Sequence, residues 1–356
     1  MSKSKIIMLL AVISGAFGIL FCSKIASEGA LHAINISVNN LIPGIFPFMA
    51  IGCLFVKLGG GVICQKLFGK IFGKIFNVSG KCTLPFIVGL ISGYPTAAAV
   101  TVSAVKRGEI SKDEAEEIIG WCCNPGIIFT LSNSENLPEG ITVWCSVVIA
   151  SIITGIISGR KKTIRIIPKN SESGNISCAR CFVDSVKEAT ANIIVICGFV
   201  VFFGTYLSIL DTLPIWRGVG DSNVIKATVF GMIEIVSGCN KLLGIALPVT
   251  LRVPLMSMLF AWSGICVHMQ IAAISEECKL NMKKYLKNKF ISCVTAPVIS
   301  FVLLKVVPVN IPVSYITPTH NPIKVFTVSF VTAILLWIIL LWTRSVFSQN
   351  KILKRK

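Results

Sequence analysis

Long apolar runs alternate with short polar segments along most of the chain. Six of these runs approach the roughly 20 residues that an α-helix needs to cross a bilayer. The pattern therefore predicts an all-α polytopic membrane protein. We expect a membrane helix in each of the six runs: Ile6–Cys22, Ile141–Ser158, Ala189–Leu210, Leu251–Ile274, Phe290–Val307 and Val325–Trp342.

Shorter apolar pieces lie between these runs, and proline, glycine or an acidic residue interrupts each of them. Backbone that leaves the helical conformation at membrane depth must find its hydrogen-bond partners in protein or in a water-filled cavity. The pattern therefore predicts broken or re-entrant helices around a cavity inside the bundle. The interrupted pieces are Leu41–Gly59, Leu84–Val102, Cys122–Ser132 and Thr228–Leu242.

The clearest interruption is Ser92-Gly93-Tyr94-Pro95, in the middle of Leu84–Val102. A helix interior tolerates glycine poorly and proline very poorly. We interpret the stretch as a built-in break that exposes backbone N–H and C=O groups to a cavity. It is the strongest single marker of a substrate site, and Thr96 directly follows it.

A second break, Ser263-Gly264, stands in a similar context in the other half of the chain. Each break continues as an apolar run that ends in a charged segment, and the next helix then reaches a proline, Pro125 or Pro297, at offsets that differ by one residue. Secondary transporters are often built from such repeats. We therefore expect a two-fold repeated helical bundle with these parts: an N-terminal transmembrane helix (1–30), a first repeat (31–167), a polar loop (168–182), a second repeat (183–310) and a C-terminal transmembrane helix with a basic tail (311–356).

Two other stretches carry helix signals. Val62–Asn77 repeats three lysines at helical spacing against apolar positions, which predicts an amphipathic helix on the membrane surface. Ser111 followed by Glu114 predicts a capping box at the start of another helix.

Composition and charge agree with a membrane protein. The chain is 54% hydrophobic and 14% charged, whereas a soluble domain has about 25% charged residues. The net charge of +18 is concentrated beside apolar runs, as at Arg160-Lys161-Lys162, which fits the positive-inside rule and contact with anionic lipids. We expect no nucleic acid as a partner. No A-x-A-like cleavage site follows the N-terminal apolar run, so we expect an uncleaved helix with its basic end in the cytoplasm.

Catalytic and nucleotide-binding motifs are missing from the sequence, which has no GxxxxGK[ST], HExxH or G-x-S-x-G pattern. Cys178 and Cys181 form one isolated CxxC, whereas a tetrahedral zinc site needs four ligands. We therefore expect no enzymatic activity, no metal and no cofactor.

Glu234 is the sharpest single candidate for a functional side chain, because acids inside a membrane are costly and usually functional. It could bind a polar group of a substrate, a proton or Na⁺. The alternative is a helix end at the interface, with Glu234 paired with Lys226 or Lys241.

Other polar residues lie near the breaks. Asn124 is expected to cap a helix that starts at Pro125, and the free N–H groups of such a cap can bind an anion. Tyr94 could stack on a planar substrate or belong to an interfacial aromatic belt. His268 and Gln270 could line the cavity, although a hydrogen-bonded histidine within the bundle is the plainer interpretation of His268.

Arg252 lies at the start of an apolar span, and its side chain has two possible interpretations. Snorkelling to the interface is the plainer one, and a counter-ion for a carboxylate substrate is the sharper one.

Four blocks of the sequence together resemble a known family. They are "LPFIVGLISGYPTAAAVTVSAVKRGEIS", "WCCNPGIIF", "GMIEIVSGCNKL" and "WSGICVHMQ", in this order. They resemble the sporulation integral membrane proteins of endospore-forming Firmicutes, within the wider nucleoside-recognition, or Gate, domain family. Cys123 departs from the pattern, because the family often has a second Asn there.

The resemblance implies a carrier with broken helices that moves dipicolinate, a planar pyridine dicarboxylate, across the outer forespore membrane during sporulation. Other members of the superfamily handle nucleosides. By position the resemblance points to Ser92, Gly93, Tyr94, Pro95, Asn124, Pro125, Glu234, Gly238, Ser263, Gly264, His268 and Gln270 as residues around the substrate.

Three functions stay open at this point. The first is a carrier for dipicolinate or another small anion, the second a nucleoside carrier, and the third a membrane scaffold in spore maturation that transports nothing. The partners expected with a carrier are its small-molecule substrate, anionic lipids and H⁺ or Na⁺ as coupling ion, with a homo-oligomer left open.

Overall fold

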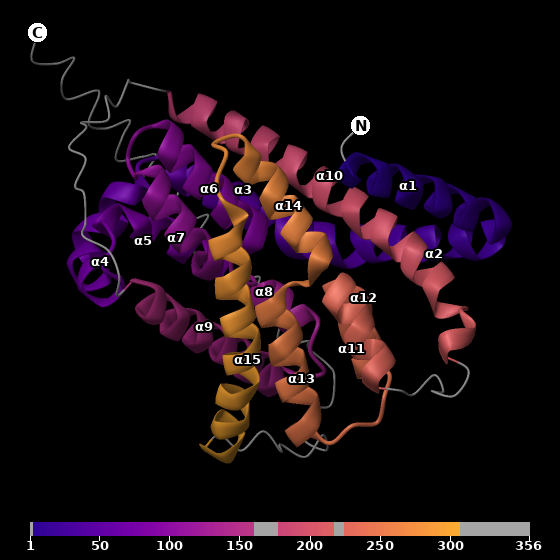
Figure 1. Ribbon diagram of the computed structural model, residues 1–356. Coiled ribbons are helices and arrows are strands. Elements are labelled where there is room, and N and C mark those ends of the chain that lie inside the picture. Colours follow the sequence, from indigo (N-terminus) through magenta and orange to yellow (C-terminus); the bar gives the residue numbers. More distant parts are fainter. Residues whose placement is uncertain (1–2, 160–176, 217–223, 307–356) are drawn as a thin grey trace, which may run out of the picture. The chain divides into compact units, whose positions relative to one another are not determined.

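The computed structural model describes residues 3–159, 177–216 and 224–306, and every regular element in these residues is a helix. The expected C-terminal span Val325–Trp342 and the basic tail lie outside them. The α-helices are α1 (Lys3–Phe21), α2 (Ser23–Ile36), α3 (Ile42–Lys57), α4 (Gly60–Phe76), α5 (Thr83–Ser92), α6 (Tyr94–Lys106), α7 (Lys112–Cys122), α8 (Ile127–Ser132), α9 (Leu137–Gly159), α10 (Cys178–Asp211), α11 (Val224–Ile233), α12 (Ile235–Leu243), α13 (Val249–Trp262), α14 (Gly264–Glu276) and α15 (Met282–Val306), with a π-helical turn at Ser37–Leu41 and short 3₁₀ turns at Gly80–Cys82 and Pro214–Trp216 (Figure 1).

Five helical segments of the described chain are long and apolar enough to cross a membrane, or six if a bent pair counts as one span. Four of them contain the expected spans in the middle and second half of the chain. The prediction that they are membrane helices is confirmed at this level. The five segments are Ser23–Lys57, Leu137–Gly159, Cys178–Asp211, Val249–Glu276 and Met282–Val306.

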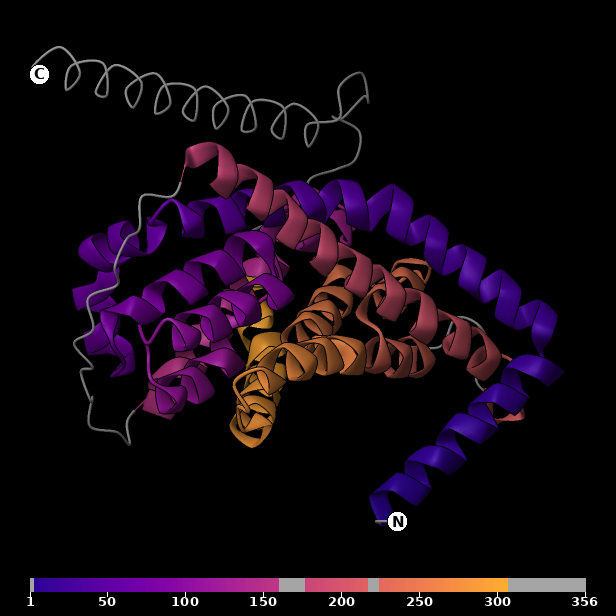
Figure 2. The same ribbon diagram turned by 90° about the horizontal axis from the view of Figure 1, so that it is seen from above.

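The N-terminal helix α1, Lys3–Phe21, covers the expected span Ile6–Cys22 up to Phe21. The chain turns a corner at Cys22, whose φ of −112° and ψ of 36° leave the helical region, and Figure 2 shows the angle between the two indigo helices there. Within the described residues, Val12–Phe21 is a shorter apolar helix, and the first of the long candidate spans begins at Ser23. The expectation that α1 crosses the membrane stays a prediction.

The segment Leu41–Gly59 is not interrupted, although its prolines predicted a break. α2, the π turn and α3 form one helical stretch of 35 residues, Ser23–Lys57. Pro43 lies in the first turn of α3, directly after the π turn, and Pro47 lies inside α3 without ending it.

The predicted amphipathic helix exists as α4, and it meets α5 at a sharp bend. The pair Gly60–Phe76 and Gly80–Ser92 is bent by 109°, so it is a broken span or a re-entrant loop. Phe72 and Phe76 pack with Phe86 and Trp121, and the Phe76 and Trp121 rings are stacked with centroids 4.6 Å apart. The capping box at Ser111 and Glu114 is confirmed at the start of α7.

α10 begins at Cys178, so the last five residues of the expected polar loop 168–182 are helical. The other expected loop residues from 168 to 176 lie outside the described ranges. α10 packs along α2 and α3.

α15 packs against α13, α9 and α7, and its two faces differ sharply. Tyr285, Lys289 and Ser292 are buried on its inner face. Large apolar side chains such as Phe290, which is 62% exposed, and Val298 cover the outer face. A helix with polar residues inside and apolar residues outside is expected where the surrounding medium is lipid.

Candidate functional site

Four interruptions of helices lie next to one another in pairs. α5 and α6 are separated by Gly93, whose φ of +95° and ψ of −174° are accessible essentially to glycine alone. α7 and α8 are separated by the stretch from Cys123 to Gly126. These two breaks touch, because a Cβ built on Gly126 would lie 2.9 Å from the Ile91 carbonyl oxygen and 3.2 Å from the Gly93 nitrogen.

The second pair of breaks has the same kind of contact. α11 and α12 are separated by Glu234, and α13 and α14 by Ser263-Gly264, where φ is +82° at both residues. A Cβ on Gly264 would lie 3.1 Å from the Ile233 carbonyl oxygen and 3.2 Å from the Ile235 nitrogen. At both pairs, the backbone of one break therefore packs directly against the backbone of the other break.

The two pairs also share an architecture. α5 packs against α6, and α11 packs against α12, so each of these broken helices folds back on itself as a hairpin. Gly238 allows the second hairpin to close, since a Cβ there would lie 2.1 Å from the Gly231 Cα. The correspondence expected between Pro125 and Pro297 is wrong, because Pro297 lies inside the unbroken helix α15 and Pro125 lies in a break.

Glu234 is buried at its break and is 1% exposed. Its carboxylate accepts hydrogen bonds from the backbone N–H groups of Val236 (3.0 Å) and Ser237 (2.7 Å), so it caps the N-terminus of α12. The alternative, in which Glu234 pairs with Lys226 or Lys241, is not what the structure shows, because both lysines form ion pairs with Asp211, at 2.6 and 3.0 Å. The dipole of α12 favours the charged carboxylate in this buried position.

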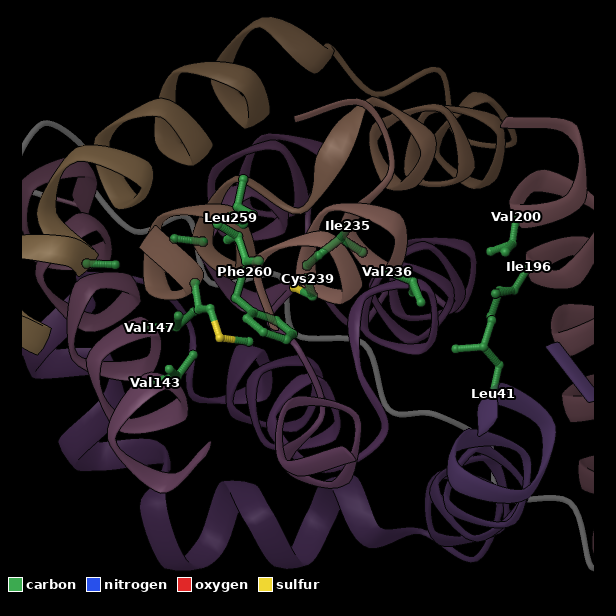
Figure 3. Close-up of a cluster of buried hydrophobic side chains, with 14 of the residues drawn as sticks. Leu41, Val143, Val147, Ile196, Val200, Ile235, Val236, Cys239, Leu259 and Phe260 are labelled. Carbon is green, nitrogen blue, oxygen red and sulfur yellow. The ribbon is translucent and has the colours of Figure 1, made fainter. Parts of the chain in front are cut away.

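A small cavity lies where the breaks meet, with a volume of about 50 Å³. Part of its wall is apolar: Figure 3 shows Leu41, Ile196 and Val200 standing together, apart from Ile235 and Val236, and all five line the cavity. Six of the predicted site residues also line it: Ser92, Gly93, Tyr94, Pro95, Glu234 and Gln270.

Tyr94 is the central residue of the first break and is 4% exposed, so it is not part of an interfacial belt. Its hydroxyl donates to the Phe260 carbonyl oxygen at 2.7 Å, and its ring meets the Phe129 ring edge-on. Gln270 projects into the same cavity with one weak partner, the Cys266 sulfur at 3.5 Å.

The other predicted residues lie outside the lining of this cavity. Pro125, Ser263 and Gly264 belong to the breaks themselves, and Thr96 lies buried one turn into α6. His268 contacts the Tyr285 hydroxyl through Nδ1 at 2.7 Å and packs edge-on against Trp262, which agrees with the plainer interpretation of a bundle histidine.

Asn124 does not cap the following helix, so that prediction is wrong. Its Nδ2 donates to the Trp121 carbonyl oxygen at 2.9 Å, and its Oδ1 accepts a hydrogen bond from Ser151. α8 begins only at Ile127, and its N-cap position is Gly126. Two intervening residues therefore separate Asn124 from the helix start, and its side chain turns back to the end of α7.

Arg252 lies in the first turn of α13 and forms ion pairs with two acidic residues. Its guanidinium donates to both carboxylate oxygens of Glu139, at 2.7 and 3.1 Å, and it also pairs with Glu135. Arg252 and Glu139 are 8% and 1% exposed, so the fork joins α13 to α9 inside the bundle.

Lys289 is a buried polar residue that the sequence analysis missed. It is 1% exposed in the middle of α15, its Nζ donates to the Cys123 carbonyl oxygen, and it lies 5.2 Å from the centre of the Tyr94 ring. It lies in a lysine-rich stretch of the sequence that also holds Lys283, Lys284 and Lys287. The spacing of Tyr285, Lys289 and Ser292 on one helix face was the signal that could have found it.

A larger cavity of about 300 Å³ lies between α2, α10 and α12. Polar groups in its lining include His32, Asp211 and Asn240. Val200 lines both this cavity and the smaller one, so the two are neighbours across a single side chain.

A metal centre has no support in the described ranges, which contain no cluster of three or more His, Cys, Asp or Glu side chains able to hold a metal ion. Cys178 is exposed and Cys181 is buried, and both are free thiols on α10.

Comparison with known proteins gives one relative. The chain is 21% identical over 302 residues to the sporulation integral membrane protein YlbJ of Bacillus subtilis (strain 168). The aligned region covers 74% of each of the two chains. No family model matches the chain, and no solved structure matches it. The apolar spans and this distant homologue together identify the chain as an integral membrane protein.

Proposed function

We propose that the chain is a membrane carrier for a small polar or anionic metabolite, and not an enzyme. The observation that carries the proposal is the meeting of broken helices at one small cavity that is lined by a buried carboxylate, Glu234. Broken helices at the centre of a membrane bundle are the usual sites of substrate and ion binding in secondary transporters.

The two hairpins and the two broken helices support a repeat with a new correspondence. In this proposal α5–α6 matches α11–α12, and α7–α8 matches α13–α14. Each hairpin then touches its own broken helix, through Gly93 and Gly126 in the first repeat and through Ile235 and Gly264 in the second. Such a repeat would let one half rock against the other around the cavity.

Dipicolinate is our first candidate for the substrate. The relative is a sporulation protein, and the four sequence blocks point the same way. Ligand pockets usually enclose about 300–1,000 Å³, so the cavity of about 50 Å³ corresponds to a closed conformation. The carrier would have to open to admit dipicolinate, and the neighbouring cavity beyond Val200 offers an approach.

A nucleoside is the second candidate. Glu234 and Gln270 face the same cavity and offer hydrogen-bond groups without positive charge, which suits a neutral, polar solute. A scaffold role in spore maturation is the third candidate, and it predicts no flux of either solute.

Glu234 is the candidate for ion coupling, to H⁺ or Na⁺, because it combines a carboxylate with almost complete burial. Anionic lipids are expected along the basic segments. A homo-oligomer is compatible with the carrier proposal.

The test is uptake of labelled dipicolinate, in parallel with labelled uridine, into proteoliposomes with defined Na⁺ and H⁺ gradients. Saturable dipicolinate uptake that empty liposomes lack would support the first candidate. Saturable uridine uptake alone would favour the second. If neither solute shows saturable flux, the carrier proposal falls and the scaffold role gains support.

A further inference from the structure

Lys289 differs from the other buried cations in the described chain. Lys226 forms an ion pair with Asp211, and Arg252 forms one with Glu139. Among the described residues no carboxylate lies within ion-pair distance of the Lys289 ammonium. A buried charge without a partner is strongly unfavourable, so the position calls for an explanation.

The contacts of Lys289 suit an ammonium group. Its Nζ donates to the Cys123 carbonyl oxygen at the end of α7, where the helix dipole is negative. It also lies over the face of the Tyr94 ring, at 5.2 Å from the centre, in a cation–π contact. These contacts hold a positive charge in place but do not neutralise it.

A polar group in the surroundings of Lys289 lacks a partner. His268 is linked to α15 through Tyr285, four residues before Lys289, and its Nε2 has no hydrogen-bond partner. A buried shell that holds an ammonium group without a counter-charge and an open imidazole nitrogen is ready for an anionic ligand.

Tyr94 belongs both to this shell and to the lining of the central cavity. One of its neighbours is Lys289, and the residue itself lines the cavity with Glu234. A movement of the Tyr94 side chain would open the ammonium group to whatever occupies the cavity.

We propose that Lys289 is the counter-charge for a carboxylate group of the transported solute, and that Tyr94 covers it in the closed conformation. The inference rests on the proposed carrier function and sharpens it, because it requires an anionic substrate. It also assigns opposite tasks to the two buried charges: Lys289 binds the anion, whereas Glu234 repels it unless a coupling cation neutralises it.

The competing explanation is purely structural, with Lys289 serving only to satisfy the carbonyl group at the end of α7. The two explanations make different predictions for Lys289→Met and Lys289→Gln. Methionine removes both the charge and the donor, whereas glutamine removes the charge but keeps a donor. Lys305→Met is a matched control, since Lys305 is an exposed lysine on the same helix.

The experiment combines thermal unfolding in detergent with proteoliposome uptake. For the wild type we expect dipicolinate, but not uridine, to raise the melting temperature, as a ligand of the folded state does. We expect both Lys289 variants to lose this shift and to raise the apparent KM for dipicolinate at least tenfold. Without dipicolinate the Lys289→Gln variant should melt no lower than the wild type, because an unpaired buried charge is gone. Lys305→Met should behave as the wild type.

The outcomes separate this inference from the function on which it rests. Wild-type uptake of dipicolinate with an unchanged KM in Lys289→Gln would overturn the role of Lys289 and leave the carrier intact. A lower melting temperature of that variant with unchanged KM would assign Lys289 to structure alone. Saturable uptake of uridine but not of dipicolinate would overturn the anionic substrate, and with it this inference.

Discussion

The hydroxyl of Tyr94 donates a hydrogen bond to the carbonyl oxygen of Phe260, 2.7 Å away and 166 residues later in the chain. Phe260 lies in the last turn of α13, directly before the break at Ser263-Gly264. The break leaves that last turn without a continuing helix to supply its donors, and Tyr94 supplies one. One side chain thus ties the first interruption of the chain to the last.

Replacing Tyr94 with phenylalanine tests this link. The Phe260 carbonyl would lose its donor, and an unsatisfied buried polar group costs about 1–3 kcal/mol. We expect a lower melting temperature in detergent and slower uptake, with the ring still present beside Lys289. Tyr206→Phe is the control, since the Tyr206 hydroxyl makes no hydrogen bond within the described part of the chain. Equal melting temperatures of the two variants would contradict the structural role of the Tyr94 hydroxyl.

The charge of Glu234 can be separated from its role as a helix cap. Glu234→Gln keeps an oxygen that can accept from the Val236 and Ser237 N–H groups, so the loss of stability should stay within the roughly 0.5–2 kcal/mol of a cap. We expect uptake to fall at least tenfold because the buried charge is gone. Glu277→Gln, at an exposed position, should leave uptake unchanged. Normal uptake by Glu234→Gln would remove Glu234 from the site.

The backbone at Gly93 predicts a strong effect of one added methyl group. Its φ and ψ are accessible essentially to glycine alone, and non-glycine residues in such regions cost about 1–3 kcal/mol. We expect Gly93→Ala to lower the melting temperature and the uptake rate together. Gly198→Ala is the matched control: Gly198 is helical, has open space around it, and should gain about 0.5–1 kcal/mol. A stable and active Gly93→Ala protein would show that the break tolerates another backbone conformation.

The ion pair between Arg252 and Glu139 should contribute a large interaction free energy to stability. Removing one partner of a buried ion pair leaves an uncompensated charge and costs about 3–5 kcal/mol. We therefore expect Arg252→Met to be strongly destabilised, and the double variant Arg252→Met with Glu139→Gln to recover much of the loss. A double-mutant cycle on unfolding free energies measures this coupling. Additive effects of the two substitutions would mean that the pair contributes no interaction energy.

The positions of the helix breaks were easier to predict from the sequence than the contacts that the neighbouring residues make. The Ser92-Gly93-Tyr94-Pro95 and Ser263-Gly264 stretches break their helices as expected, because local backbone preferences decide such breaks. Asn124 was assigned to the wrong helix end, since two residues between it and α8 changed which backbone groups it could reach. Pro43 and Pro47 predicted a break, but both lie within the continuous helical stretch Ser23–Lys57, which contains a π turn directly before α3.

Side-chain partners were the least predictable feature. Asp211 lies 15 and 30 residues before the two lysines that it binds, whereas the sequence offered them only as alternative partners of Glu234. Lys289 lies in a lysine-rich stretch of the sequence, yet its side chain is buried. Both features concern contacts between segments, which a pattern along one helix does not contain.

The sequence by itself determined that the chain is an integral membrane protein of helices, where its main spans lie and where two of its helices break. These properties follow from the length of apolar runs and from the local preferences of glycine and proline. Only the tertiary structure decided that the breaks meet in pairs at one cavity, that Glu234 caps α12, and that Lys289 is buried beside Tyr94. The physical reason is that burial and charge pairing depend on which distant segments pack together, and a buried charge takes its partner from space and not from sequence.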